Sequence, residues 1–103
     1  MKLSVVIPAY NEAHRIGDTL KRIVAFCESQ LSEWEVIVVD DGSSDDTEQA
    51  VRAIEQVQYI RNEENRGKGF SVRRGIMAAR CDCVLFTDAD LSAPITEARI
   101  DSR

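Results

Sequence analysis

Two aspartates that are one residue apart, Asp88 and Asp90, follow an apolar run and could share one metal ion. The run, residues 84–87, is typical of a buried strand. Carboxylate oxygens are the ligands that Mg²⁺ and Mn²⁺ prefer, and both ions keep positions open for phosphate oxygens. A metal held in this way would neutralise a departing diphosphate. The alternative is a solvated turn in which Ser92 caps a helix, but the place directly after a strand favours the metal site.

A second acidic pair, Asp40 and Asp41, ends another apolar run and precedes Gly42. A carboxylate there can accept a hydrogen bond from a nucleobase imide or a ribose hydroxyl. The alternative role is a helix N-cap, but Ser44 or Asp45 can supply that cap, which leaves the pair for another task. Adjacent aspartates also occur in receiver domains of two-component systems. They follow the first strand there and the second strand here, so that class is disfavoured.

The segment after the first apolar run is Pro8-Ala9-Tyr10-Asn11-Glu12. Tyr10 could lie along a base, and Glu12 could face the positive end of the following helix or touch the ligand. Taken alone, the segment fits equally well with a plain strand-to-helix turn in which Asn11 is the cap.

Positive charge concentrates in Arg66-Gly67-Lys68-Gly69 and in the nearby Arg73 and Arg74. Glycines let the backbone approach a phosphate, and a helix N-terminus adds a favourable dipole. The spacing is not that of a Walker loop, and Val72 occupies the third glycine position of a dinucleotide fingerprint. A solvated helix start is the alternative, and it suits Arg73 and Arg74 better than Lys68.

Strands and helices alternate along the chain and would position these groups. Short apolar runs, several of them β-branched, predict strands buried on both faces of a parallel sheet: residues 3–7, 36–39, 58–60 and 84–87. Apolar stripes with helical spacing lie between them, at residues 16–31, 47–54 and 72–79. Asp45 and Glu48 resemble a capping box before the second stripe. This order predicts an α/β fold, a three-layer sandwich with a mainly parallel sheet in strand order 3-2-1-4.

Ligands of open α/β sheets bind beyond the carboxyl ends of the strands. Each polar cluster follows a predicted strand at that end, so we expect the clusters to meet at one edge. His14 is interpreted as an exposed helix residue and Trp34 as a packing anchor. The residues offer no triad for nucleophilic catalysis, and the catalytic residues remain unassigned.

The composition of the 103 residues fits a single soluble domain, with 44% hydrophobic and 30% charged residues. A net charge of −5 argues against nucleic-acid binding, which needs a basic surface. Cys27, Cys81 and Cys83 lack the spacing of a metal knuckle or a redox pair, so we expect reduced thiols. The first apolar run is too short for a signal core or a membrane span. We therefore expect a cytoplasmic location, at a membrane face in the full-length protein.

Residues 94–103 could begin a helix, and no further strand is expected after them. The strand at residues 84–87 would then form an edge of the sheet, with unpaired backbone groups and uncovered apolar surface. Such an edge favours self-association.

The ordered set of motifs resembles the signature of family 2 glycosyltransferases, which have the nucleotide-diphospho-sugar transferase (GT-A) fold. The resemblance covers residues 3 to about 95 and rests on four segments: 4–12, 38–43, 65–69 and 88–90. The sequence of residues 86–94, together with residues 65–69, is most similar to the dolichyl-phosphate glucosyltransferase and polyprenyl-phosphate glycosyltransferase branch. That family's domain continues for many more residues, so the chain corresponds to its N-terminal part, without the acceptor pocket.

The resemblance implies a function and the residues that serve it. A sugar would pass with inversion from a UDP- or GDP-sugar to an acceptor, a polyprenyl or dolichyl phosphate, with Mg²⁺ or Mn²⁺. The residues implied for the nucleotide sugar are Pro8, Ala9, Tyr10, Glu12, Asp40, Asp41, Arg66, Lys68, Asp88 and Ala89, and those implied for the metal are Asp88 and Asp90. The alternative is a truncated, catalytically silent nucleotide-binding or interaction module. A nucleotidyltransferase fits poorly, because it would need a basic, glycine-rich loop after the first strand.

Overall fold

The computed structural model describes residues 2–87 and 99–101. The sheet has the order β3-β2-β1-β4-β5. Its strands are β1 (Lys2–Ala9), β2 (Glu33–Asp40), β3 (Val57–Arg61), β4 (Cys83–Phe86) and β5 (Arg99–Asp101). The first four pair with one another in parallel, which confirms the predicted order 3-2-1-4 and the parallel pairing.

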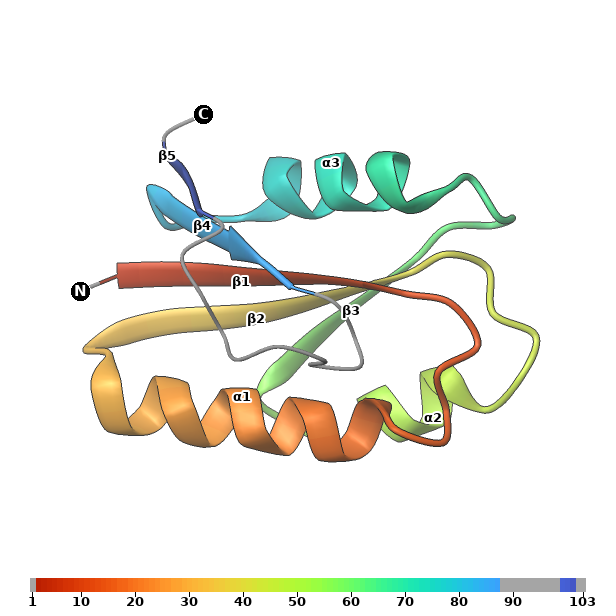
Figure 1. The fold of residues 1–103 in the computed structure, drawn as a ribbon, viewed down its shortest axis with the longest axis horizontal. Coiled ribbons are helices and arrows are strands. Elements are labelled where there is room, and N and C mark those ends of the chain that lie inside the picture. Colours follow the sequence, from red (N-terminus) through yellow and green to blue (C-terminus); the bar gives the residue numbers. More distant parts are fainter. Residues whose placement is uncertain (1, 88–98, 102–103) are drawn as a thin grey trace.

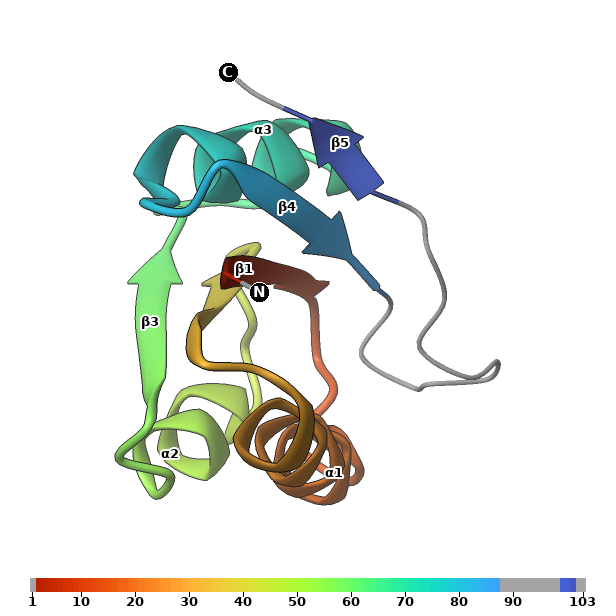
Figure 2. The ribbon, with the colours of Figure 1, turned by 90° about the vertical axis from the view of Figure 1, so that its left-hand side faces the viewer.

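Helices cover both faces of this sheet, as the sequence predicted. Helices α1 (Ile16–Gln30) and α2 (Thr47–Arg52) lie on one face, and α3 (Lys68–Ala78) lies on the other (Figures 1 and 2). The predicted three-layer α/β sandwich is therefore confirmed. None of the helices in the described ranges is long and apolar enough to cross a membrane.

Two apolar clusters fill the spaces between the three layers. Alternating side chains of β1 and β2 divide between them, because successive residues of a strand point to opposite faces. Val5, Ile7 and Val36 pack toward α1, while Val6 and Val39 pack toward α3. Trp34 packs against the α1 side from within β2, which confirms its interpretation as a packing residue.

The prediction for the C-terminal segment was wrong in the part that the structure describes. Arg99–Asp101 is a strand, and it pairs antiparallel with β4, Val84 opposite Ile100. β4 is therefore not an edge of the sheet, and the argument for self-association from its unpaired backbone no longer applies. A three-residue strand is too short to show periodicity in the sequence. An antiparallel strand also needs no crossover helix before it, so no helical pattern indicates its presence.

A carboxylate fastens the amino-terminal edge of the sheet, away from the loops that carry the motifs. Glu35 accepts hydrogen bonds from Ser4 Oγ at 2.6 Å, from Gln58 Nε2 at 2.9 Å and from the Arg80 backbone N at 2.5 Å. Burial opposes its ionisation, but these bonds together lower the pKa of Glu35. β1, β3 and the turn before β4 are thus tied to β2 at this edge.

Helix α3 packs close to the sheet at Gly75. A Cβ at this position would lie 2.3 Å from Val6 Cγ1 and 3.2 Å from Val39 Cγ2. We expect Gly75→Ala to lower the free energy of unfolding by roughly 1–3 kcal/mol, because overpacked cores must shift side chains or backbone. Urea denaturation measures the change.

Gly17 provides the matched control in α1, where an added Cβ would meet nothing within 4 Å. Gly17→Ala should be neutral or stabilising by up to about 1 kcal/mol, because alanine is the better helix former. Equal effects of the two substitutions would contradict the close approach of α3.

Candidate functional site

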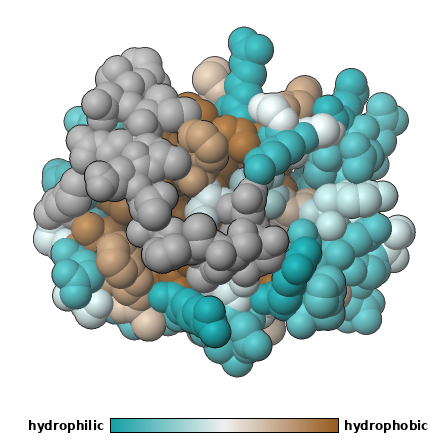
Figure 3. Space-filling model, in the orientation of Figure 1, coloured by the Kyte–Doolittle hydropathy of each residue, from teal (hydrophilic) through white to brown (hydrophobic). Residues whose placement is uncertain are grey.

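The carboxyl ends of β1, β2 and β3 meet at one edge of the sheet. Ala9 lies opposite Asp40, and Asp40 lies opposite Arg61. The pairing continues one residue further, because Asp41 N donates to Ala9 O at 2.8 Å and Asn62 N donates to Asp40 O at 2.8 Å. The loops after the three strands therefore leave the sheet side by side. Figure 3 shows that the side of the molecule where these loops lie, on the right, is largely hydrophilic.

Asn11 joins the loop after β1 to the loop after β2. Its backbone N donates to Ser43 Oγ at 2.8 Å, and its side-chain Oδ1 accepts from Ser44 N at 2.9 Å. Asn11 has a φ of 52°, a conformation that asparagine tolerates better than most residues. The alternative interpretation of Asn11 as the cap of α1 is therefore wrong. The helix begins at Ile16 without a side-chain cap.

The next two residues add further hydrogen bonds between the loop after β1 and the segment that follows β2. Glu12 N donates to Thr47 Oγ1 at 2.9 Å, and Ala13 N donates to Asp45 Oδ2 at 3.2 Å. Asp45 Oδ1 also accepts from Thr47 N at 3.0 Å at the start of α2. The capping box with Glu48 is not formed, since Glu48 instead pairs with Arg52 at 2.8 Å.

The residues predicted to line the base pocket from β1 differ in their exposure. Pro8 is half-buried and Ala9 is buried, because both belong to the strand. Tyr10, the first residue past the strand, is 46% exposed, so its side chain is accessible from solvent. Glu12 is half-buried, and its Oε1 accepts from Arg15 Nε at 2.6 Å.

Asp40 is fully buried at the end of β2. Its Oδ1 accepts from Ser43 N at 2.9 Å, and its Oδ2 accepts from Tyr59 OH at 2.5 Å and Arg61 Nη1 at 3.2 Å. Burying a carboxylate is unfavourable unless it is paired and hydrogen-bonded, and Arg61 supplies the opposite charge. Burial and the bond to Asp40 raise the pKa of Tyr59 to about 12, so Tyr59 remains the donor at neutral pH.

Asp41 is also buried, and it holds the loop that follows β3. Its Oδ1 accepts from Arg66 N at 2.7 Å and from Asn62 Nδ2 at 2.9 Å, and its Oδ2 accepts from Gly67 N at 2.8 Å. Burial opposes its ionisation, but hydrogen bonds from Arg66, Asn62, Gly67 and Ser71 together lower the pKa of Asp41. Both members of the acidic pair are therefore bonded to protein groups, and their contact with a nucleotide stays a prediction.

The basic segment lies directly above this carboxylate and leads into α3. Gly67 has a φ of 99°, and Lys68 is the exposed first residue of the helix. Gly42 allows the backbone of this loop to pack closely against it, since a Cβ at Gly42 would be 2.8 Å from the backbone carbon of Glu64. The guanidinium of Arg66 lies over the Phe70 ring, 5.5 Å from its centroid. The structure thus brings Asp41 and Lys68 to the same edge.

Four residues of this edge were missed by the sequence analysis: Tyr59, Arg61, Asn62 and Ser71. Tyr59 and Arg61 are two positions apart in β3, so their side chains lie on the same face of the strand, and both bond Asp40 Oδ2. Asn62 follows β3 directly, so its place at the carboxyl end of a strand was the signal that could have identified it. Arg74, interpreted as a solvated residue, instead donates to Arg61 O and to Asn62 Oδ1, both at 2.8 Å.

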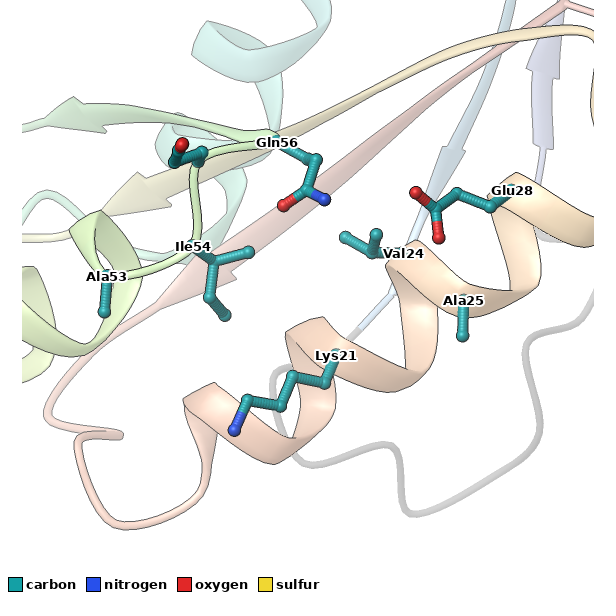
Figure 4. A pocket seen from close by; sticks show the side chains of 8 residues that line it. Lys21, Val24, Ala25, Glu28, Ala53, Ile54 and Gln56 are labelled. Carbon is teal, nitrogen blue, oxygen red and sulfur yellow. The ribbon is translucent and has the colours of Figure 1, made fainter.

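Two of the hollows in the surface help to delimit the site. A pocket of about 250 Å³ borders the loop after β3; it is lined by Arg61, Asn62, Glu63, Arg66, Phe70 and Arg74. Another, of about 420 Å³, lies between α1 and the turn from α2 to β3 (Figure 4). Its lining includes none of the residues in the loops directly after β1, β2 and β3, so this pocket is separate from the candidate site.

The predicted metal ligands Asp88 and Asp90, together with Ala89, lie outside the described residues. The last described residue before them, Thr87, donates its N–H to Val6 O at 3.1 Å. In the ranges that the structure describes, no group of three or more His, Cys, Asp or Glu side chains could hold a metal ion. His14 is exposed, as predicted, but it precedes α1 and so does not belong to the helix, contrary to the prediction.

No disulfide joins Cys27, Cys81 and Cys83 in the described part of the chain. Cys27 is fully buried in α1, and burial raises the pKa of its thiol to about 11. Such a thiol is poorly ionised and serves packing.

Comparison with known proteins decides the family. The sequence model described as Glycosyl transferase family 2 matches residues 4–97. The chain belongs to glycosyltransferase family 2. The resemblance stated from the motifs is thereby confirmed.

Individual glycosyltransferases are similar to this chain over most of its length. Dolichyl-phosphate beta-glucosyltransferase of Saccharomyces cerevisiae is 43% identical, and the match covers 85% of this chain and 29% of the relative. The structure of S. aureus TarS 1-349 in complex with UDP-GlcNAc has a TM-score of 0.76 and 32% identity, covering 87% of this chain and 27% of that one.

A second solved structure is the mannosyltransferase PcManGT from Pyrobaculum calidifontis in complex with GDP-Man and Mn²⁺. Its TM-score is 0.75 at 29% identity, and the match covers 89% of this chain and 32% of that one. The likeness supports the predicted GT-A fold. The chain spans between 27% and 32% of the length of these three proteins.

The bonds to Asp41 predict a measurable pH dependence of stability. Asp41→Asn removes the charge and should lower the free energy of unfolding by about 2 kcal/mol or more at pH 7. The folded pKa of Asp41 is lowered, so its contribution is complete above the unfolded pKa, near 3.8, and is lost as the pH falls through the folded pKa. The difference between wild type and variant should therefore shrink below about pH 4 in urea denaturation.

Asp82→Asn serves as the control, because Asp82 is an exposed aspartate in the turn before β4. Its unfolding curves should match the wild type across the same range. A deficit in Asp41→Asn that stays constant down to about pH 3 would contradict the assignment.

Proposed function

We propose that this chain binds the nucleotide-diphospho-sugar donor of an inverting family 2 glycosyltransferase, whose acceptor is a polyprenyl or dolichyl phosphate. The observation that carries the proposal is the meeting of three elements at one sheet edge in a chain of this family. These are the exposed Tyr10, the acidic pair after β2, and the loop from Arg66 to Lys68 that Asp41 holds. An aromatic face, carboxylates and a basic helix start suit a base, a ribose and a diphosphate respectively.

Relatives support the donor and acceptor classes. One similar structure contains UDP-GlcNAc and another contains GDP-Man with Mn²⁺, which supports either nucleotide. The yeast relative is named for transfer to dolichyl phosphate. Because this chain spans only about a third or less of these proteins, donor binding is the part of the function that it can itself be tested for.

A divalent cation fits the carboxylates that follow β4 in the sequence. We propose that Asp88 and Asp90 hold Mg²⁺ or Mn²⁺, since two oxygen donors leave coordination positions for phosphate oxygens. The bound ion would supply positive charge to the leaving diphosphate. The chain's own residues would hold the base and ribose from Pro8, Ala9, Tyr10, Glu12 and Asp40, and the diphosphate side from Lys68 and Arg66.

Calorimetric titration of the chain with UDP and with GDP, each with and without Mn²⁺, tests donor binding. We expect one of the two nucleotides to bind, and more tightly with Mn²⁺. If a folded sample bound neither nucleotide, the proposal would fail, and a catalytically silent interaction module would become the better interpretation.

The metal assignment has a separate test in Asp90→Ala. Loss of a carboxylate ligand should reduce the metal-dependent part of nucleotide affinity by on the order of a few kcal/mol and leave metal-free affinity unchanged. Asp82→Ala is the matched control, because Asp82 lies at the opposite end of β4 and is exposed. An unchanged response to Mn²⁺ in Asp90→Ala would exclude Asp90 as a ligand.

A further inference from the structure

Asn62 is a buried polar side chain at the candidate site, and its amide makes three hydrogen bonds. It is 2% exposed, and its Nδ2 donates to Asp41 Oδ1 and to Ser71 Oγ, both at 2.9 Å. Its Oδ1 accepts from Arg74 Nη1 at 2.8 Å. The carboxylate can only accept and the guanidinium can only donate, so these two neighbours fix the orientation of the amide.

The amide joins three elements through one planar group. Its own backbone follows β3, Asp41 follows β2, and Ser71 and Arg74 belong to α3. Arg74 Nη1 also donates to Arg61 O, so the guanidinium is itself held in place from the end of β3. The position of α3 relative to the end of β2 is thereby coupled to one side chain.

The Asp41 carboxylate transmits this coupling to the loop before α3. With one acceptor position taken by Asn62, Asp41 accepts from two consecutive backbone N–H groups, those of Arg66 and Gly67. Two consecutive bonds to one carboxylate define the direction of the turn, and the positive φ of Gly67 completes it. Lys68 is the next residue, so the turn determines where its side chain begins.

We propose that Asn62 is a positioning residue for the diphosphate side of the nucleotide site. It orients the Asp41 carboxylate, which holds the turn at Arg66 and Gly67 and so directs Lys68 and the start of α3 toward the phosphates. This inference rests on the proposed donor-binding function. It predicts that loss of the amide weakens the binding of phosphates and leaves the binding of the nucleoside part unchanged.

Asn62→Ala tests the proposal, and Ser4→Ala serves as its control. Ser4 is also buried, but its hydroxyl donates to Glu35 at the amino-terminal edge of the sheet, away from Asp41 and the turn at Arg66 and Gly67, so its loss controls for general destabilisation. Calorimetry below the melting temperature compares UDP with uridine, or GDP with guanosine if the wild type prefers GDP. We expect Asn62→Ala to weaken nucleoside-diphosphate binding about tenfold and nucleoside binding less than about twofold. Ser4→Ala should change neither by more than about twofold.

Amide hydrogen exchange provides a readout that does not depend on a ligand. The N–H groups of Arg66 and Gly67 should exchange faster in Asn62→Ala and remain protected in Ser4→Ala. If Asn62→Ala does not fold, Arg74→Ala replaces it, because Arg74 is exposed and its loss frees the amide while leaving Asn62 in place. It should show the same selective loss with a smaller size.

Equal weakening of nucleoside and nucleoside diphosphate, or unchanged exchange at Arg66 and Gly67, would overturn the proposal and leave Asn62 as a stabilising residue only. If the wild type binds no nucleotide, donor binding itself fails. The exchange measurement then still shows whether Asn62 holds the turn, so the two failures can be told apart.

Discussion

The parallel pairing of β1 with β2 is the constraint on which the rest of the molecule depends. Both strands are apolar on both faces, so burial alone specifies their register weakly. Polar groups at the two ends supply what the apolar residues do not. Ser4 bonds to Glu35, which lies opposite it, and Asp41 N bonds to Ala9 O at the far end. This register places the loops after β1 and β2 together, and the candidate site exists only because of it.

The acidic pair shows how two adjacent negative charges can be buried at such an edge. The structure uses a different partner for each. Asp40 is neutralised by Arg61, a full positive charge from the neighbouring strand. Asp41 instead receives N–H groups from the backbone and from Asn62. Among the described residues, no buried side-chain polar atom lacks a hydrogen-bond partner, so this dense polar layer leaves no uncompensated group.

Most of the architecture could be predicted because it follows from periodicity and alternation. The apolar runs that became β1 and β2, and the helical stripe from Ile16, each carry a signal many residues long. β5 has three residues and carries none. The loops that gather at the site could be predicted from their place after strands, but the partners of each side chain could not. Asn11 resembled a helix cap because its local sequence fits one, and only the register of β1 on β2 brings Ser44 within its reach.

Glu35 fastens the amino-terminal edge of the same sheet from which the loops emerge at the other edge. Asp40 lies five positions further along the extended strand, a span of roughly 16 Å. Groups that far apart with no shared partner contribute to stability almost independently. The molecule can therefore accumulate sequence change at its loops while the opposite edge keeps the strands in line. In evolutionary terms, one end of the sheet can diversify for new ligands because the other end preserves the frame.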